Sequence, residues 1–141
     1  MDIVLIEDNP ADMRLVREAL AENATPAVLH WMPSGEEALS FLRHEKAHAG
    51  APAPDLVLLD LNLPGLHGHE VLAAIKQDPL LRHIPVVVLT SSSARVDVLE
   101  AYQAHANAYV VKPADFEKFL ALVGEIHGYW LRSVMLPSRV D

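Results

Sequence analysis

Short apolar runs alternate along the chain with longer stretches in which apolar residues recur every three or four positions. Four runs are almost continuously apolar, at residues 3–6, 56–59, 86–89 and 109–111. Runs of this length and composition are typical of strands buried on both faces of a parallel sheet. A fifth run, at residues 28–32, contains His30 and Trp31 and suits an edge strand.

The stretches between the runs have the spacing of amphipathic helices, as Met13, Val16 and Leu20 illustrate. Residues that favour helix starts stand before several of these stretches, namely Asn9-Pro10, Ser34, Ser93 and Asp115. Strand and helix therefore alternate five times, which predicts a doubly wound α/β fold with a five-stranded parallel sheet. Residues 47–54, rich in proline and small side chains, are expected to form a surface loop within one domain.

Polar residues follow or end four of the predicted strands. Glu7 and Asp8 come after the first strand, Asp60 after the third, Thr90 at the end of the fourth and Lys112 after the fifth. The carboxyl ends of parallel strands share one edge of the sheet, which is where ligands bind in such folds. Three carboxylates placed together repel one another unless a lysine or a hard cation neutralises them. Oxygen ligands of this kind favour Mg²⁺ or Mn²⁺.

These residues together resemble the receiver domain of two-component response regulators. The resemblance covers about residues 1–126 and rests on Glu7-Asp8, Asp60, Thr90 and Lys112-Pro113, on the loop Asp60-Leu61-Asn62-Leu63-Pro64-Gly65, and on Gly68 at the start of the next helix. It implies a flavodoxin-like (βα)5 fold. It also implies a phosphoryl acceptor that promotes its own phosphorylation and dephosphorylation and is not a turnover enzyme.

By this resemblance, Asp60 is the nucleophile that accepts a phosphoryl group from a phosphohistidine or a small acyl phosphate. Asp8 and Asp60 would bind the divalent cation through their carboxylates, and Asn62 through its main-chain carbonyl. Glu7 would hold a water bound to that cation. The cation would offset the charge of the transferring group.

The resemblance also assigns roles to residues at the ends of the last two strands. Lys112 and Thr90 would contact the phosphoryl oxygens, and Pro113 would follow a cis peptide bond. Tyr109 would turn inward with Thr90 as a switch that alters the face formed by the fourth helix, fifth strand and fifth helix. For Tyr109 a plain core position is the alternative, and for Thr90 a loop and helix-cap role.

The histidines do not form a recognisable metal motif. His67 and His69 flank Gly68 near Asp60, but the chain has no cysteine and no second histidine four residues from either. We expect none of the histidines to be a metal ligand; they are His30, His44, His48, His67, His69, His83, His105 and His127.

Residues 127–141 form a C-terminal extension that carries an apolar cluster. Its apolar members are Tyr129, Trp130, Leu131, Val134, Met135 and Leu136. Packing against the same domain is one interpretation, and a dimer or kinase interface is the other. With residues 91–93 and 106–109, this ending resembles the single-domain response regulators of bacterial phytochromes. That likeness implies a phytochrome histidine kinase as partner and a homodimer formed through the fourth helix, fifth strand and extension.

Composition limits which ligands and which cellular location we expect. The formal net charge of −8 disfavours binding to nucleic acid or anionic lipid. The acidic N-terminus does not resemble a signal peptide, and no apolar run approaches the roughly 20 residues that span a bilayer. We therefore expect a cytoplasmic protein.

Two other functions compete with the receiver. A phosphorylation-independent interaction module could share the fold, although the complete polar set argues against lost chemistry. An aspartate-nucleophile phosphatase of the haloacid-dehalogenase type would carry an Asp-x-Asp motif after an early strand. Here Asp60 follows the third strand and is succeeded by Leu61-Asn62.

Overall fold

The computed structural model describes residues 1–22 and 26–140. Over these residues the chain forms one five-stranded, wholly parallel sheet in the order β2-β1-β3-β4-β5. The strands are β1 (Asp2–Ile6), β2 (Val28–Met32), β3 (Leu56–Leu59), β4 (Val86–Thr90) and β5 (Ala108–Val111). The predicted fold class is confirmed, and the mixed run at residues 28–32 is an edge strand as expected.

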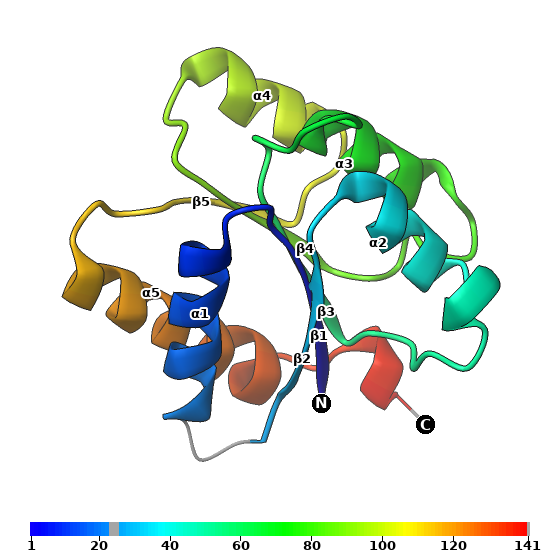
Figure 1. Ribbon diagram of the computed structural model, residues 1–141, viewed down its shortest axis with the longest axis horizontal. Coiled ribbons are helices and arrows are strands. Elements are labelled where there is room, and N and C mark those ends of the chain that lie inside the picture. Colours follow the sequence, from blue (N-terminus) through cyan, green and yellow to red (C-terminus); the bar gives the residue numbers. More distant parts are fainter. Residues whose placement is uncertain (23–25, 141) are drawn as a thin grey trace.

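Helices cover both faces of the sheet, as Figure 1 shows. Helices α1 and α5 lie on one face, and α2, α3 and α4 lie on the other. Their bounds are α1 (Pro10–Ala21), α2 (Gly35–Leu42), α3 (Gly68–Gln77), α4 (Arg95–Gln103) and α5 (Phe116–Gly128).

Each central strand supplies both cores because successive side chains point to opposite faces. In β1, Ile3 and Leu5 pack with α1 and α5, whereas Val4 and Ile6 pack with α2 and α3. All four side chains are at most 2% exposed. This two-sided burial explains why the sequence of β1 is continuously apolar and does not alternate.

Three of the predicted helix caps are confirmed. The Asn9 side chain accepts a hydrogen bond from Ala11 N (2.9 Å) ahead of α1. Ser34 Oγ accepts from the backbone in the first turn of α2, and Asp115 Oδ1 does so in α5. Each cap fixes the residue at which its helix begins, and so sets how the preceding loop crosses the sheet edge.

The C-terminal extension packs partly on the domain. Helix α5 is followed by a π-helical turn, Tyr129–Ser133, and a 3₁₀ turn, Pro137–Arg139. Leu131 (5% exposed) and Leu136 (2%) join the core between the sheet, α1 and α5. Tyr129 and Met135 are exposed. The predicted apolar cluster is therefore divided, and its role as an interface stays a prediction.

A buried carboxylate holds the end of this extension against the sheet. Asp55, immediately before β3, accepts a hydrogen bond from Asp2 N (2.7 Å). It also accepts from Ser138 Oγ and from an Arg139 guanidinium nitrogen (3.2 Å). We call Asp55, Asp2, Ser138 and Arg139 the tail clasp. It joins β1, β3 and the last turn of the chain.

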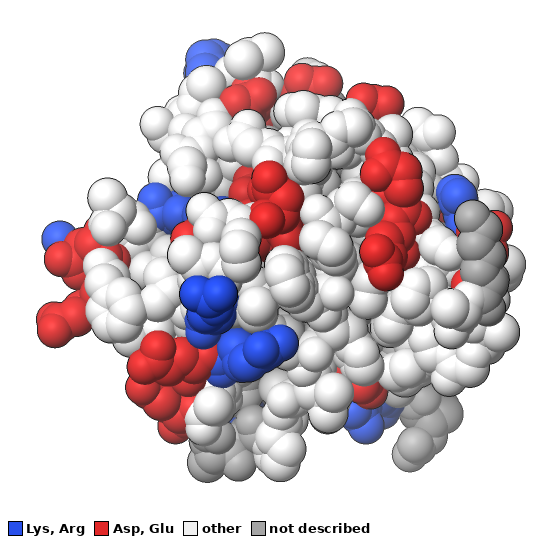
Figure 2. All heavy atoms as spheres, in the orientation of Figure 1, with Lys and Arg blue, Asp and Glu red and all other residues white. Residues whose placement is uncertain are grey.

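No helix in residues 1–22 and 26–140 is long and apolar enough to cross a membrane. On the face shown in Figure 2, the Lys and Arg side chains of the described residues lie in small separate groups and form no continuous basic surface.

Candidate functional site

The polar residues predicted to form a site lie together at the carboxyl edge of the sheet. Glu7 follows β1, Asp60 follows β3, Thr90 ends β4 and Lys112 follows β5. Glu7, Asp60 and Thr90 are buried, and Asp8 is exposed at the rim. The strand ladder continues past the strand ends through Asp60 N to Ile6 O (3.0 Å), which fixes the backbone around the carboxylates.

Lys112 lies at the centre of the site, where its ammonium group contacts three carboxylates. Nζ donates to Asp60 Oδ2 (3.0 Å), to Asp12 Oδ2 (2.9 Å) and to Glu7 Oε1. Only 6% of the Lys112 side chain is exposed. Burial by itself would lower the pKa of Lys112, but the hydrogen bonds from Lys112 to Glu7 and Asp12 outweigh that effect and raise it. The lysine is therefore a fixed positive charge.

Both carboxylate oxygens of Asp60 accept hydrogen bonds. Oδ1 accepts from Thr90 Oγ1 (2.8 Å) and from Asn62 N (3.1 Å), while Oδ2 accepts from Lys112. Burial raises the pKa of Asp60, but the hydrogen bonds with Glu7, Asn62 N and Lys112 prevail, so its pKa is lowered. Asp60 is thus ionised at neutral pH, which is the state that a nucleophile requires.

Glu7 has the opposite protonation behaviour. Only 2% of the residue is exposed, and this burial raises its pKa from 4.5 to about 7 although Lys112 opposes the change. Glu7 can therefore carry a proton while Asp60 beside it is ionised. Two neighbouring acids with separated pKa values are typical of functional sites.

The acidic residues fit a divalent cation. One carboxylate oxygen from each of Glu7, Asp8 and Asp60 lies within 4.8 Å of the others. Lys112 supplies a single positive charge to a site that also includes Asp12, so the negative charge is in excess. A hard cation with oxygen ligands would balance it. Binding by the main-chain carbonyl of Asn62 stays a prediction; in this structure Asn62 contributes its N–H to Asp60.

Tyr109 connects the site to α4 by hydrogen bonds. Its hydroxyl donates to Ser92 O (2.8 Å), and Tyr109 N donates to the Tyr102 hydroxyl on α4 (3.2 Å). Ser92 Oγ donates to Asp97 in the first turn of α4. Ser92 is two residues after Thr90, and the role of Thr90 and Tyr109 as a switch stays a prediction. Tyr109 is half-buried against the core, so its core and switch interpretations are compatible.

The prediction that Ser93 caps α4 is wrong. The N-cap is Ala94, whose side chain makes no cap hydrogen bond. Ser92 Oγ instead accepts from Ala94 N (3.3 Å) while donating to Asp97. A serine hydroxyl commonly bonds the backbone two residues ahead, and here that turn displaces the expected cap by one residue.

The predicted cis peptide bond before Pro113 is also wrong, because the Lys112–Pro113 bond is trans. Lys112 N continues the ladder by donating to Thr90 O (2.8 Å), and Nζ reaches Asp60 from this backbone. The trans form therefore suffices to place the lysine in the site.

Two residues that the sequence reasoning missed contact the site. Asp12, in the first turn of α1, binds Lys112. Trp31, on β2, donates its indole N–H to Glu7 O (2.6 Å). Asp12 has a detectable signal, because the first turn of a helix that follows a strand lies at the same sheet edge as the end of that strand. The Trp31 contact depends on side-chain orientation and leaves no pattern in the sequence.

The histidines near the site have structural roles in this structure. His67 caps α3, its Nδ1 accepting from His69 N (3.3 Å). His69 Nε2 lies 3.4 Å from Asp97 and 3.7 Å from Glu100, which joins α3 to α4. The prediction that the histidines bind no metal is not tested, and we note that His69, Asp97 and Glu100 lie close enough together to share an ion.

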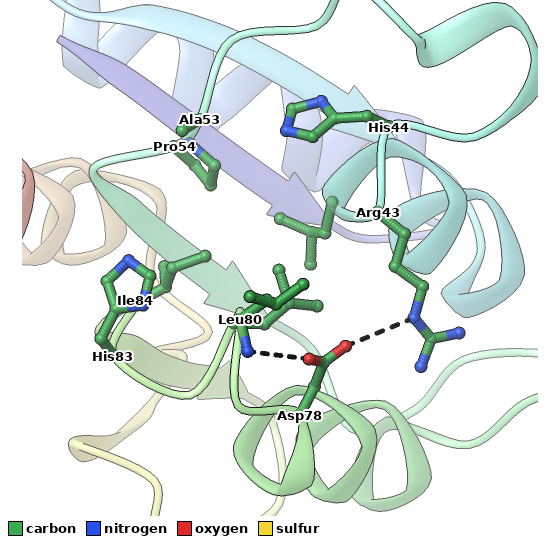
Figure 3. A pocket seen from close by; sticks show the side chains of 10 residues that line it. Arg43, His44, Ala53, Pro54, Asp78, Leu80, His83 and Ile84 are labelled. Carbon is green, nitrogen blue, oxygen red and sulfur yellow. Dashed lines mark hydrogen bonds and ion pairs between the residues drawn. The ribbon is translucent and has the colours of Figure 1, made fainter.

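A separate cavity of about 240 Å³ lies at the opposite edge of the sheet, where β3 and β4 begin. Figure 3 shows His44 and His83 on either side of it and the Arg43–Asp78 ion pair at its rim. Its lining is mainly apolar, and it contains none of the carboxylates described above. The cavity is therefore separate from the acidic site at the carboxyl edge.

Comparison with known proteins matches this arrangement to one family. Residues 3–124 match the model of the response regulator receiver domain. Response regulator Rcp1 of Synechocystis is 43% identical over 136 residues, which cover 96% of this chain and 92% of Rcp1. A probable methanogenesis regulatory protein, FilR2 of Methanothrix harundinacea, is 45% identical over 92% of this chain and 83% of its own length.

Solved structures agree with the sequence matches. The phosphorylated cyanobacterial phytochrome response regulator RcpA superimposes with a TM-score of 0.94 at 46% identity, over 96% of this chain and 97% of RcpA. The Mn²⁺-bound form of Rcp1 gives a TM-score of 0.93 at 43% identity, over 96% and 98% of the two chains. The similarity thus extends over the sheet, the site and most of the C-terminal extension.

Proposed function

This chain belongs to the response-regulator receiver family, and on that premise we propose that Asp60 accepts a phosphoryl group from a sensor histidine kinase in the cytoplasm. One observation carries the proposal: the ionised Asp60 carboxylate is held by Lys112, Thr90 Oγ1 and Asn62 N at a buried edge of the sheet. A carboxylate with a lowered pKa beside a fixed lysine is suited to attack phosphorus.

The proposed transfer is a displacement at phosphorus. A carboxylate oxygen of Asp60 forms the new P–O bond while the P–N bond to the kinase imidazole breaks, and the electron pair stays on the imidazole nitrogen. Lys112 and Thr90 would contact the phosphoryl oxygens as charge develops on them. Attack by water on the phosphorus of the acyl phosphate would later return Asp60 to its free form.

We assign the divalent cation to Glu7, Asp8, Asp60 and the Asn62 carbonyl. When bound, it would neutralise charge on the phosphoryl oxygens. Support comes from the spacing of the three carboxylates and from the Mn²⁺-bound structure of the relative Rcp1. Mg²⁺ and Mn²⁺ both prefer oxygen ligands, so we propose that either ion can serve.

We propose that the output is a protein interface on α4, β5 and α5. In support, Thr90 bonds Asp60, and Tyr109 bonds both Ser92, two residues after Thr90, and Tyr102 on α4. Exposed apolar side chains lie on this face, namely Val96, Leu99, Tyr102 and Val111. An apolar face of this kind could support a homodimer, to which the exposed Tyr129 and Met135 of the extension would contribute.

For the partner, we propose a phytochrome histidine kinase. The proposal rests on the likeness to Rcp1 and RcpA, the latter a phytochrome response regulator. The similar identity to FilR2 means that a kinase with another stimulus is the competing partner. Phosphotransfer measured in parallel from a phytochrome kinase and from an unrelated kinase would decide between them.

The site assignment is tested by intact mass after incubation with acetyl phosphate, with and without Mg²⁺. We expect a Mg²⁺-dependent gain of one phosphoryl group in the wild type and none in Asp60→Asn. Labelling of Asp60→Asn at the wild-type rate would contradict the assignment. No labelling of the wild type would favour an interaction module that does not use phosphorylation.

A further inference from the structure

The ammonium group of Lys112 has three N–H donors, and each has a different carboxylate partner. Two of those partners, Glu7 and Asp60, belong to the proposed cation site. The third, Asp12, is not one of the three residues whose oxygens cluster there, yet it lies as close to Nζ (2.9 Å) as Asp60 does (3.0 Å). Asp12 is thus the one lysine partner that a cation would not share.

Asp12 is held by the start of α1. Asn9 caps this helix, accepting from Ala11 N (2.9 Å) and from Asp12 N (3.4 Å), and Pro10 is its first residue. The Asp12 side chain is only 26% exposed. Asp12 and Lys112 line a cavity of about 250 Å³ between α1 and the segment that follows β5. The carboxylate therefore projects from a rigid position toward the lysine.

We infer that Asp12 is a positioning residue that holds Lys112 in place when Glu7 and Asp60 turn to a bound cation and a phosphoryl group. This inference rests on the proposed phosphoryl transfer. In the resting site Lys112 is shared among three acids. Once a cation shares two of them, Asp12 keeps one N–H of the lysine fixed, and the remaining two are directed at the incoming phosphoryl oxygens. Such preorganisation is the main way in which a site of this kind promotes the reaction.

A simpler role for Asp12 would be to stabilise α1. An acidic residue in the first turn interacts favourably with the positive end of a helix. That role requires a charge near the helix start but no contact with Lys112, which follows β5. The two roles therefore predict different behaviour of the lysine, and the lysine can be observed directly.

The first test observes the Lys112 ammonium group by nitrogen NMR in the unphosphorylated protein, with and without Mg²⁺. Protected ammonium protons give a distinct signal, and we expect that signal in the wild type in both conditions. Asp12→Ala should lose it when Mg²⁺ is present, and Asp12→Glu should restore it. Glu18→Ala, which removes an exposed acid from the same helix, is the matched control and should retain it. A retained signal in Asp12→Ala would overturn the inference.

The second test measures the rate of labelling by acetyl phosphate at saturating Mg²⁺. We expect Asp12→Ala to be labelled roughly tenfold more slowly, Asp12→Glu to recover much of the rate, and Glu18→Ala to match the wild type. An unchanged or higher rate in Asp12→Ala would mean that Asp12 does not position the lysine for transfer. Failure of the proposed function can be told from failure of this inference. If the wild type is not labelled, the proposed function fails, whereas the NMR signal still reports whether Asp12 holds Lys112.

Discussion

Strand β3 has a buried aspartate at each end, and the two differ in their surroundings. Asp55, before the strand, is 4% exposed and accepts hydrogen bonds from Asp2 N, Ser138 and Arg139. Asp60, after it, is 6% exposed and lies beside acids as well as donors. Both pKa values are lowered. Burial and a shifted pKa therefore do not distinguish a reactive carboxylate from a structural one.

The balance of charge distinguishes them. Asp55 has a guanidinium and neutral donors around it, so its charge is satisfied within the chain. Around Asp60, one lysine binds Glu7, Asp12 and Asp60 itself, and Asp8 adds a further carboxylate to the same cluster. A site that keeps excess negative charge in a buried position loses stability unless something else is bound. The excess of negative charge at the carboxyl edge is the physical reason for proposing a cation site at this end of β3.

Replacing each aspartate in turn with asparagine gives the largest expected effects. Asp60→Asn should lose all labelling by acetyl phosphate, because the amide that replaces the carboxylate is not a nucleophile for phosphorus. Asp55→Asn should be labelled like the wild type but lose about 2 kcal/mol of unfolding free energy, since it turns an amide group toward the Asp2 and Ser138 donors. Urea denaturation measures the loss in Asp55→Asn; labelling of Asp60→Asn, or no labelling of Asp55→Asn, would contradict the distinction between the two ends.

The next largest effect is expected from a change of pH. Glu7 has a higher pKa in the folded protein, about 7, than its ordinary 4.5, so the folded state binds this proton more tightly. The stability that Glu7 contributes to the folded state is complete below pH 4.5 and is lost as pH rises through about 7. The loss amounts to about 3 kcal/mol of unfolding free energy. Asp55 and Asp60 have lowered pKa values, so their contributions are present above 3.8 and are lost as pH falls through the lowered values.

Denaturation of the cation-free protein at pH values below and above the Glu7 pKa measures this loss of stability. Glu7→Gln should abolish the loss between mildly acidic and slightly alkaline pH while leaving the acid limb unchanged. Saturating Mg²⁺ should also suppress the loss, because the ionised Glu7 then has a cation beside it. A wild-type curve that is flat across this range would mean that Glu7 is not the buried acid we describe.

The smallest effect is expected at the tail clasp. Ser138→Ala removes one hydrogen bond to the buried Asp55, which should lower the free energy of unfolding by about 1 kcal/mol. Arg139→Ala should matter less, since that side chain is 47% exposed. Neither variant should change labelling of Asp60. Slower labelling in either one would show that the two ends of β3 are coupled through the sheet.

The sheet was predictable from the sequence because burial on both faces leaves continuous apolar runs. The runs at residues 28–32 and 56–59 coincide with β2 and β3, while β4 extends one residue further, through Thr90, and β5 begins one residue earlier, at Ala108. These two strands adjoin polar residues, where composition no longer marks the end of pairing. The positions of Glu7, Asp60 and Lys112 followed from the strands alone, since each comes directly after one.

What the sequence could not reveal depends on side chains that meet across elements. Asp12 binds Lys112 from α1, 100 residues earlier in the chain, and Trp31 binds Glu7 O from β2. Leu131 and Leu136 are buried while Met135 between them is exposed, a division set by how the extension crosses the domain. The cap predicted at Ser93 was wrong because the hydroxyl of Ser92, one residue earlier, makes the hydrogen bonds at the start of α4.

The indole of Trp31 gives the protein an optical property of its own. Its N–H bonds the carbonyl of Glu7, within the residue whose side chain we assign to the cation site. Indole emission responds to hydrogen bonding and to nearby charge, so filling the site should alter the fluorescence of Trp31 with no label attached. Trp130, the second tryptophan, packs in the extension beside Tyr129 and would supply a steady background. Loading of the site could then be followed in real time by intrinsic fluorescence.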